Sequence, residues 1–86
     1  MTKVYFPLYD RGWYVEEVDA DQLYLMTPNR VARHKNNTAY PGFYGTIYDA
    51  TCCFKTVESA RGYINKEAVP LDQRYTAFKR LEEKDL

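Results

Sequence analysis

The sequence predicts a single α+β domain in which a three- to four-stranded antiparallel sheet is covered on one face by two helices. Three observations predict it. First, residues 3–27 consist of short segments of β-branched and aromatic residues separated by polar turns. Second, an apolar run at residues 47–54 leads into a helical pattern. Third, the last segment of the sequence repeats apolar residues at helical spacing. A chain of 86 residues has the length of one domain, so residues 1–86 are expected to fold in the order β-β-β-loop-β-α-α.

Residues 3–9, 13–18 and 23–27 are predicted to form the strands of an antiparallel meander. The first two are joined by a turn at residues 10–12, which ends in a glycine that suits a positive φ, and residues 19–22 form a second polar turn. Side chains alternate along a strand, so the meander should have a core face and an outer face. The core face is expected to carry Val4, Phe6, Trp13, Val15, Leu23 and Leu25, and the outer face a stripe of Tyr5, Tyr14 and Tyr24.

Residues 46–64 are predicted to form the centre of the fold, where a buried strand leads directly into a helix. The run from Ile47 to Phe54 is nearly all apolar or β-branched, which is typical of a strand buried on both faces. Thr56 is expected to be the N-cap of the helix, and apolar residues follow at helical spacing as far as Ile64. Gly62 is expected to let this helix approach the sheet closely.

A second helix is predicted after Pro70, with Asp72 as its N-cap. Four apolar residues recur at positions i, i+4, i+7 and i+10, which places them on one helical face. They are Leu71, Tyr75, Phe78 and Leu81. This helix is expected to cover the sheet beside the first one.

The long connection at residues 28–45 is the main candidate for a functional loop. It lacks clear periodicity and is longer than most connections in a compact domain. Its first half is basic, with one helical turn expected at 29–34, and its second half is aromatic. The basic residues are Arg30, Arg33, His34 and Lys35, and the aromatic ones are Tyr40, Phe43 and Tyr44.

No pattern in the sequence indicates catalysis, a cofactor or a metal site. Nucleophilic catalysis needs a nucleophile beside a base, and the one histidine, His34, has no family pattern around it. Two adjacent cysteines and one histidine do not supply the four ligands of a zinc site. Cys52 and Cys53 are neighbours on a predicted strand and point to opposite faces, so they are interpreted as unpaired buried hydrophobic residues in a reducing cytoplasm. No apolar run is long enough to cross a membrane.

Charge and composition favour a protein-binding role. Twelve basic and twelve acidic side chains cancel, which argues against a protein that coats DNA. The chain has nine tyrosines, a residue that protein interfaces favour. We therefore expect a small non-enzymatic protein that binds and regulates or inhibits another macromolecule, with a protein as the favoured partner. In type it resembles the small inhibitors that phages and mobile elements encode. The residues expected to contact the partner are Tyr5, Tyr14, Tyr24, Arg30, Arg33, Tyr40, Phe43 and Tyr44.

Two other kinds of partner stay open. The first is a second copy of the chain, in a homodimer formed through an open sheet edge. The alternative function is single-stranded nucleic-acid binding by the loop 28–45, whose basic residues would follow phosphates while its aromatic residues stack on bases.

Overall fold

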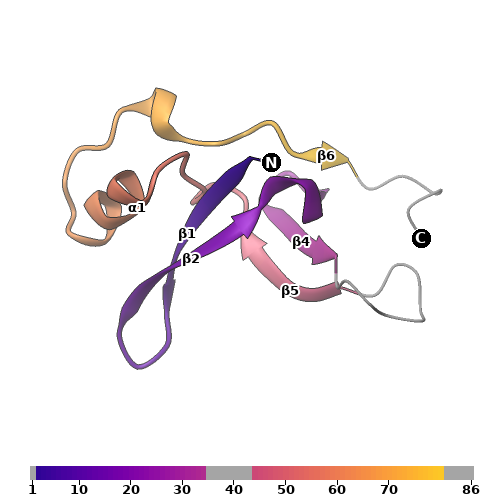
Figure 1. Ribbon diagram of the computed structural model, residues 1–86, viewed down its shortest axis with the longest axis horizontal. Helices are drawn as coiled ribbons and strands as arrows, with labels where there is room; N and C mark the ends of the chain where they lie inside the picture. The colour runs from indigo at the N-terminus through magenta and orange to yellow at the C-terminus, as the bar shows by residue number, and fades with distance from the viewer. Residues whose placement is uncertain (1, 35–43, 81–86) are drawn as a thin grey trace.

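The computed structural model describes residues 2–34 and 44–80, and in these ranges it shows a mixed α+β fold with two β-sheets and a single α-helix (Figure 1). Within this part of the chain, no helix is long and apolar enough to cross a membrane. Two 3-10 turns, Ala20–Gln22 and Leu71–Gln73, separate some of the elements. The elements are β1 (Lys3–Tyr9), β2 (Trp13–Asp19), β3 (Leu23–Thr27), β4 (Arg30–His34), β5 (Tyr44–Asp49), α1 (Val57–Ile64) and β6 (Lys79–Arg80).

The first sheet is the predicted hairpin of β1 and β2. Its three-residue turn has Arg11 at φ 60° and Gly12 at φ 149°, and the second of these angles is one that a side chain would strain. The other edge of β1 is bridged by Phe54, which exchanges two backbone hydrogen bonds of 2.8 and 2.9 Å with Tyr5. Phe54 in turn bridges to Arg74, so three segments far apart in sequence lie side by side.

The register of the hairpin corrects the expected faces of the meander. A three-residue turn pairs residues of equal parity, so Phe6 lies opposite Glu16 and Leu8 lies opposite Tyr14. Tyr14 therefore shares the core-facing side of the hairpin with Val4 and Phe6, whereas Trp13 and Val15 share the other side with Tyr5. The predicted stripe of Tyr5, Tyr14 and Tyr24 on one face is wrong, and so is the placement of Trp13 in the core.

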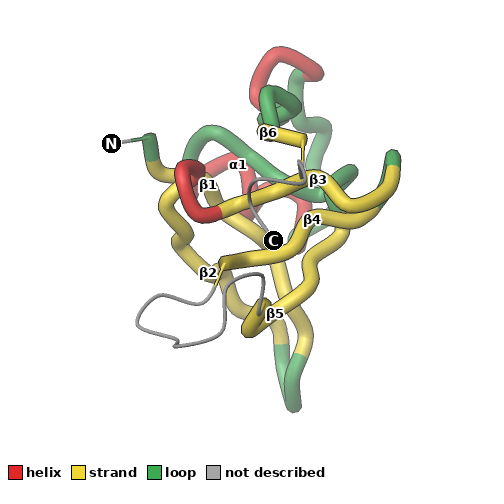
Figure 2. The backbone as a smooth tube through the Cα atoms, turned by 90° about the vertical axis from the view of Figure 1, so that its right-hand side faces the viewer, coloured by secondary structure: helices red, strands yellow, loops and turns green. Residues whose placement is uncertain are grey.

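The second sheet has the order β5-β4-β3-β6 (Figure 2). It is mixed, because β6 runs parallel to β3 whereas the other pairs are antiparallel. The helical turn expected at residues 29–34 is wrong, since β4 occupies this segment. Val31 and Ala32 are completely buried there, between partners on both sides. Pairing of residues 30–34 with β3 and β5 therefore makes this segment a strand, although its local propensity favours no single conformation.

The second predicted helix is also wrong. After the 3-10 turn Leu71–Gln73 the chain is extended as far as β6, and Leu71 is 81% exposed. Lys55 donates its amide to the Gln73 carbonyl at 2.8 Å, and Tyr75 donates its amide to the Cys53 carbonyl at 2.9 Å. These long-range bonds hold the segment in an extended form. Tyr75 and Phe78 are partly buried against the core from this extended segment, so an apolar spacing that fitted a helix is satisfied by a strand-like chain.

The predicted strand of residues 47–54 ends earlier, at Asp49. The Asp49 carboxylate accepts hydrogen bonds from the Thr51 amide at 2.9 Å and the Thr51 hydroxyl at 2.6 Å, which turns the chain. The helix that follows is confirmed, with Thr56 as its N-cap, since the Thr56 hydroxyl accepts from the Ser59 amide at 3.1 Å. The expected role of Gly62 is wrong. A Cβ there would meet Glu67 at 3.3 Å and Val69 at 3.4 Å, and both residues follow the helix rather than belonging to the sheet.

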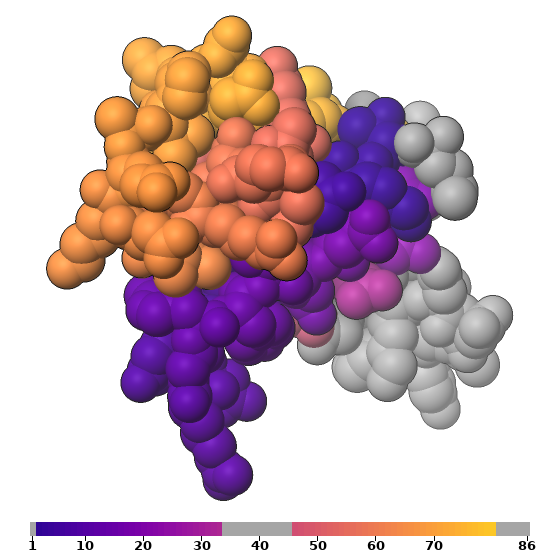
Figure 3. All heavy atoms as spheres, turned by 60° about the vertical axis from the view of Figure 1, so that its left-hand side comes forward, coloured from indigo at the N-terminus to yellow at the C-terminus, as the bar shows by residue number. Residues whose placement is uncertain are grey.

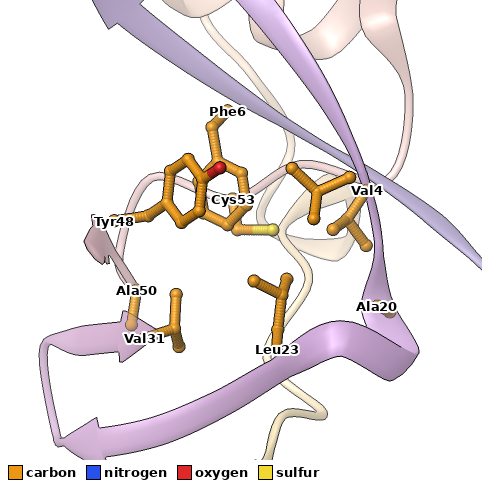
Figure 4. Close-up of a cluster of buried hydrophobic side chains, with 9 residues drawn as sticks. Val4, Phe6, Ala20, Leu23, Val31, Tyr48, Ala50 and Cys53 are labelled. Carbon is orange, nitrogen blue, oxygen red and sulfur yellow. The ribbon is translucent and has the colours of Figure 1, made fainter. Parts of the chain in front are cut away.

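The main core lies between the two sheets (Figure 4). Phe6 from β1 stacks on Tyr48 from β5, and the completely or almost completely buried side chains around them include Val4, Val18, Leu23, Val31 and Cys53. The helix α1 packs against β1 and β2, and both Ala60 and Phe54 are fully buried. Cys53 is a buried free thiol, as expected, but Cys52 is only partly buried.

Candidate functional site

The predicted contact residues do not form one surface. Tyr5 is half-buried and its hydroxyl donates to the Glu17 carboxylate at 3.1 Å, whereas Tyr14 is exposed on the opposite face of the hairpin. Tyr24 is half-buried in the second sheet, on β3. Burial and the hydrogen bond to Glu17 raise the pKa of Tyr5 above its ordinary value.

The two arginines of the predicted loop are separated as well. Arg30 and Arg33 both lie on β4, and Arg33 shares its face with the buried Val31 whereas Arg30 is exposed on the other face. The Arg33 Nε–H donates to the Gln22 side chain at 3.3 Å, which ties β4 to the 3-10 turn Ala20–Gln22. Tyr44 is the first residue of β5, and Tyr40 and Phe43 lie outside the described residues.

Among the residues whose burial the structure describes, the most exposed aromatic side chains gather at the end of the β1–β2 hairpin. Tyr9 is 68% exposed, Trp13 54% and Tyr14 44%. Tyr9 and Trp13 are opposite one another in the register and meet edge to face, with ring centroids 5.5 Å apart. The end of the hairpin projects from the body of the molecule as a narrow finger (Figure 3). A tryptophan more than half exposed on such a projection is unusual, because tryptophan is strongly buried on average.

A groove of about 440 Å³ runs from this aromatic end toward the helix. Trp13, Tyr14 and Val15 line it from β2. Val57, Arg61, Ile64 and Asn65 line it from α1 and its C-terminal end. We call these residues, together with Tyr9, the hairpin–helix surface.

The chemistry of the hairpin–helix surface suits the recognition of a polypeptide. Aliphatic side chains form part of the groove, Trp13 and Tyr14 bring aromatic rings with one polar atom each, and Arg61 and Asn65 add a guanidinium and an amide. This mixture of aromatic anchors, an arginine and few other charges is the composition of the centre of a protein interface. Among the described residues, no group of histidine, cysteine and carboxylate side chains could hold a metal ion.

The cysteines do not line the groove of the hairpin–helix surface. Among the described residues, the geometry identifies no group that activates either thiol as a nucleophile. Burial raises the pKa of the Cys53 thiol to about 12, which keeps it protonated at neutral pH. The Cys52 thiol donates to the Tyr63 hydroxyl at 3.5 Å, and this contact raises the pKa of Tyr63. The hydrogen bonds from Thr51 lower the pKa of Asp49.

Sequence reasoning missed Tyr9, Trp13 and the helix side of the groove. The first two could have been found, because a turn of three residues fixes which strand positions share a face. The contribution of Arg61 and Ile64 had no local signal, since it depends on how α1 packs against the hairpin.

Comparisons with protein-family models, with curated proteins and with solved structures found no match for this chain.

Proposed function

We propose that this is a small non-enzymatic protein that binds another protein through the hairpin–helix surface and thereby regulates or inhibits it. The observation that carries the proposal is the exposure of Tyr9, Trp13 and Tyr14 on a projecting hairpin beside a groove. Solvent-exposed aromatic clusters of this kind favour partner binding, since their burial removes a large apolar area from water at little cost in side-chain entropy.

The nucleic-acid alternative has less support from the described residues. A single-stranded ligand would need cationic groups along one track with stacking rings beside them. Arg30 and Arg33 point to opposite faces of β4, and Arg33 is engaged by Gln22. The strand β2, which carries Trp13 and Tyr14, contributes two glutamates and one aspartate, and these offset the cations beside the exposed rings, Arg11 in the turn and Arg61 on α1.

The test is affinity capture with matched variants of the purified protein. The variant Trp13→Ser/Tyr14→Ser removes two exposed anchors from the hairpin–helix surface. The control Met26→Ser/Leu71→Ser removes two side chains that are 45% and 81% exposed outside that surface. Both variants are first checked for wild-type unfolding behaviour. Proteins from nuclease-treated extract of the source cell should be retained by the wild type and the control but not by the hairpin variant.

Two outcomes would contradict the proposal. Equal retention by the wild type and the hairpin variant would place the interaction elsewhere. Proteins that the wild type retains from untreated extract but not from nuclease-treated extract would favour the nucleic-acid alternative. If the retained protein is the chain itself, sedimentation equilibrium of the two variants decides whether the same surface forms a homodimer.

A further inference from the structure

Arg74 carries a charge that the described part of the chain leaves without an ion pair. Its side chain is half-buried, in the extended segment between the second 3-10 turn and β6. Its Nη1 donates to the Thr51 carbonyl at 2.6 Å, and its guanidinium carbon lies 5.8 Å from the centre of the Phe54 ring. Its Nε is buried and makes no hydrogen bond to a described residue. Buried polar groups are nearly always paired, so the described residues leave part of the donor capacity of this guanidinium unused.

Arg74 lines a pocket of about 280 Å³ that shares no residue with the hairpin–helix surface. Apolar side chains dominate the pocket, and hydroxyl groups and the guanidinium are its polar elements. The apolar lining includes Leu25, Pro28, Ala50 and Phe78, and the hydroxyl groups include those of Thr51 and Thr76. An apolar enclosure with a few convergent polar groups is the usual form of a small-ligand site.

We propose that this pocket binds a small monocarboxylate with an apolar body, and that the guanidinium of Arg74 is the group that recognises the carboxylate. Arginine presents a planar set of donors that matches a carboxylate, and a partly buried position strengthens the pairing. A monoanion fits better than a phosphate because there is one guanidinium, and because the Asp49 carboxylate, which accepts from the pocket residue Thr51, is a negative charge beside the pocket. The volume lies just below the roughly 300–1,000 Å³ of sites for drug-sized ligands, so the acid is of fragment size.

The experiment is a titration of the ¹⁵N-labelled full chain with benzoate, followed by amide chemical shifts, with neutral benzamide as the matched probe. Benzoate should give saturable shifts at Ala50, Thr51, Tyr75 and Thr76, with a dissociation constant of about 1–10 mM, as small fragments do. Benzamide should bind at least about tenfold more weakly, the ratio expected when one charge-assisted hydrogen bond is lost.

Variants then assign the preference to one side chain. Arg74→Gln should lower benzoate affinity to the level of benzamide. Arg80→Gln is the control, because Arg80 is exposed and lines only the adjoining groove, and it should change the affinity less than about twofold. Should Arg74→Gln fail to fold, Arg74→Lys keeps the charge without the planar donors and should weaken benzoate several-fold. The proposal is overturned if benzoate produces no saturable shift, if benzoate and benzamide bind alike to the wild type, or if Arg80→Gln weakens benzoate as much as Arg74→Gln does.

Discussion

The ring of Phe6 on β1 lies nearly parallel to the ring of Tyr48 on β5, with centroids 4.3 Å apart and an interplanar angle of 16°. This stack joins the two sheets at the centre of the core, where Phe6 is 1% and Tyr48 2% exposed (Figure 4). The Tyr48 hydroxyl is buried and makes no hydrogen bond to a described residue. Burial therefore raises the pKa of Tyr48, and the nearby Glu16 carboxylate raises it further while Arg33 lowers it. The aromatic surface of Tyr48 thus stabilises the fold, whereas its hydroxyl lies near the Glu16 and Arg33 side chains without the geometry of a hydrogen bond to either.

Replacing Tyr48 by Phe should leave the free energy of unfolding unchanged or raise it by up to about 1 kcal/mol, because an unpaired buried hydroxyl is removed while the stack stays. Urea denaturation measures the change. Tyr75→Phe is the matched control, since the Tyr75 hydroxyl donates to the Ala77 carbonyl at 3.1 Å, and it should cost about 0.5–1 kcal/mol. A loss of more than about 1 kcal/mol in Tyr48→Phe would show that the hydroxyl has a stabilising partner.

Local signals in the sequence were sufficient for the elements that depend on local chemistry. The strands β1, β2 and β3 were predicted within one residue, because the turn around Gly12 and the stop at Pro28 are encoded beside them. The start of α1 followed from Thr56 in the same way. The strands β4 and β6 could not be found like this, since each is defined by partners across the sheet rather than by its own composition.

The second prediction concerns Thr56, the N-cap of α1. Thr56→Ala should lower the free energy of unfolding by about 1 kcal/mol, because the Ser59 amide loses its acceptor at the helix N-terminus. Thr56→Ser keeps the hydroxyl and should stay within about 0.5 kcal/mol of the wild type. The comparison is made by thermal and urea unfolding monitored at 222 nm. Equal stabilities of the alanine and serine variants would mean that the cap contributes nothing.

Gly62 gives the third prediction, since it occupies a helix interior without the need for close packing on the sheet. Gly62→Ala should raise the free energy of unfolding by up to about 1 kcal/mol through helix propensity. The new methyl group would lie 3.3 Å from the Glu67 carboxylate, which is the flexible end of a side chain, and 3.4 Å from Val69. Glu67→Ala in the same background should therefore change the gain only slightly. A destabilised Gly62→Ala variant that Glu67→Ala restores would instead show that this contact is rigid.

The candidate site illustrates why function was harder to predict than fold. The expected tyrosine stripe combines residues from both faces of the hairpin, because a turn of three residues pairs strand positions of equal parity. In the observed register Trp13 and Tyr14 lie on different faces, yet both line the groove. The surface thus arises from the turn length together with the packing of α1, and the second of these is a long-range property.

The buried thiol of Cys53 gives a prediction about pH. Its pKa is raised from 9.0 to about 12 in the folded chain, chiefly by burial. Below about pH 9 both states hold the proton, so the thiol has no effect on the pH dependence of stability. Between about pH 9 and 12 the unfolded state releases the proton while the folded state retains it, so the free energy of unfolding falls as the pH rises. In the lower part of this window the slope due to Cys53 should approach roughly 1 kcal/mol per pH unit.

Urea denaturation at several pH values from about 8 to 10, with a reductant present, tests this slope as a difference between variants, because tyrosine ionisation in the unfolded state contributes to all of them alike. The variant Cys53→Ala should start from a lower free energy of unfolding, because a buried side chain is truncated, but should lose stability less steeply than the wild type. Cys52→Ala retains the Cys53 thiol and serves as the control, with the wild-type slope expected. Parallel slopes for the wild type and Cys53→Ala would mean that water reaches Cys53 in the folded chain and that its burial between the two sheets is incomplete.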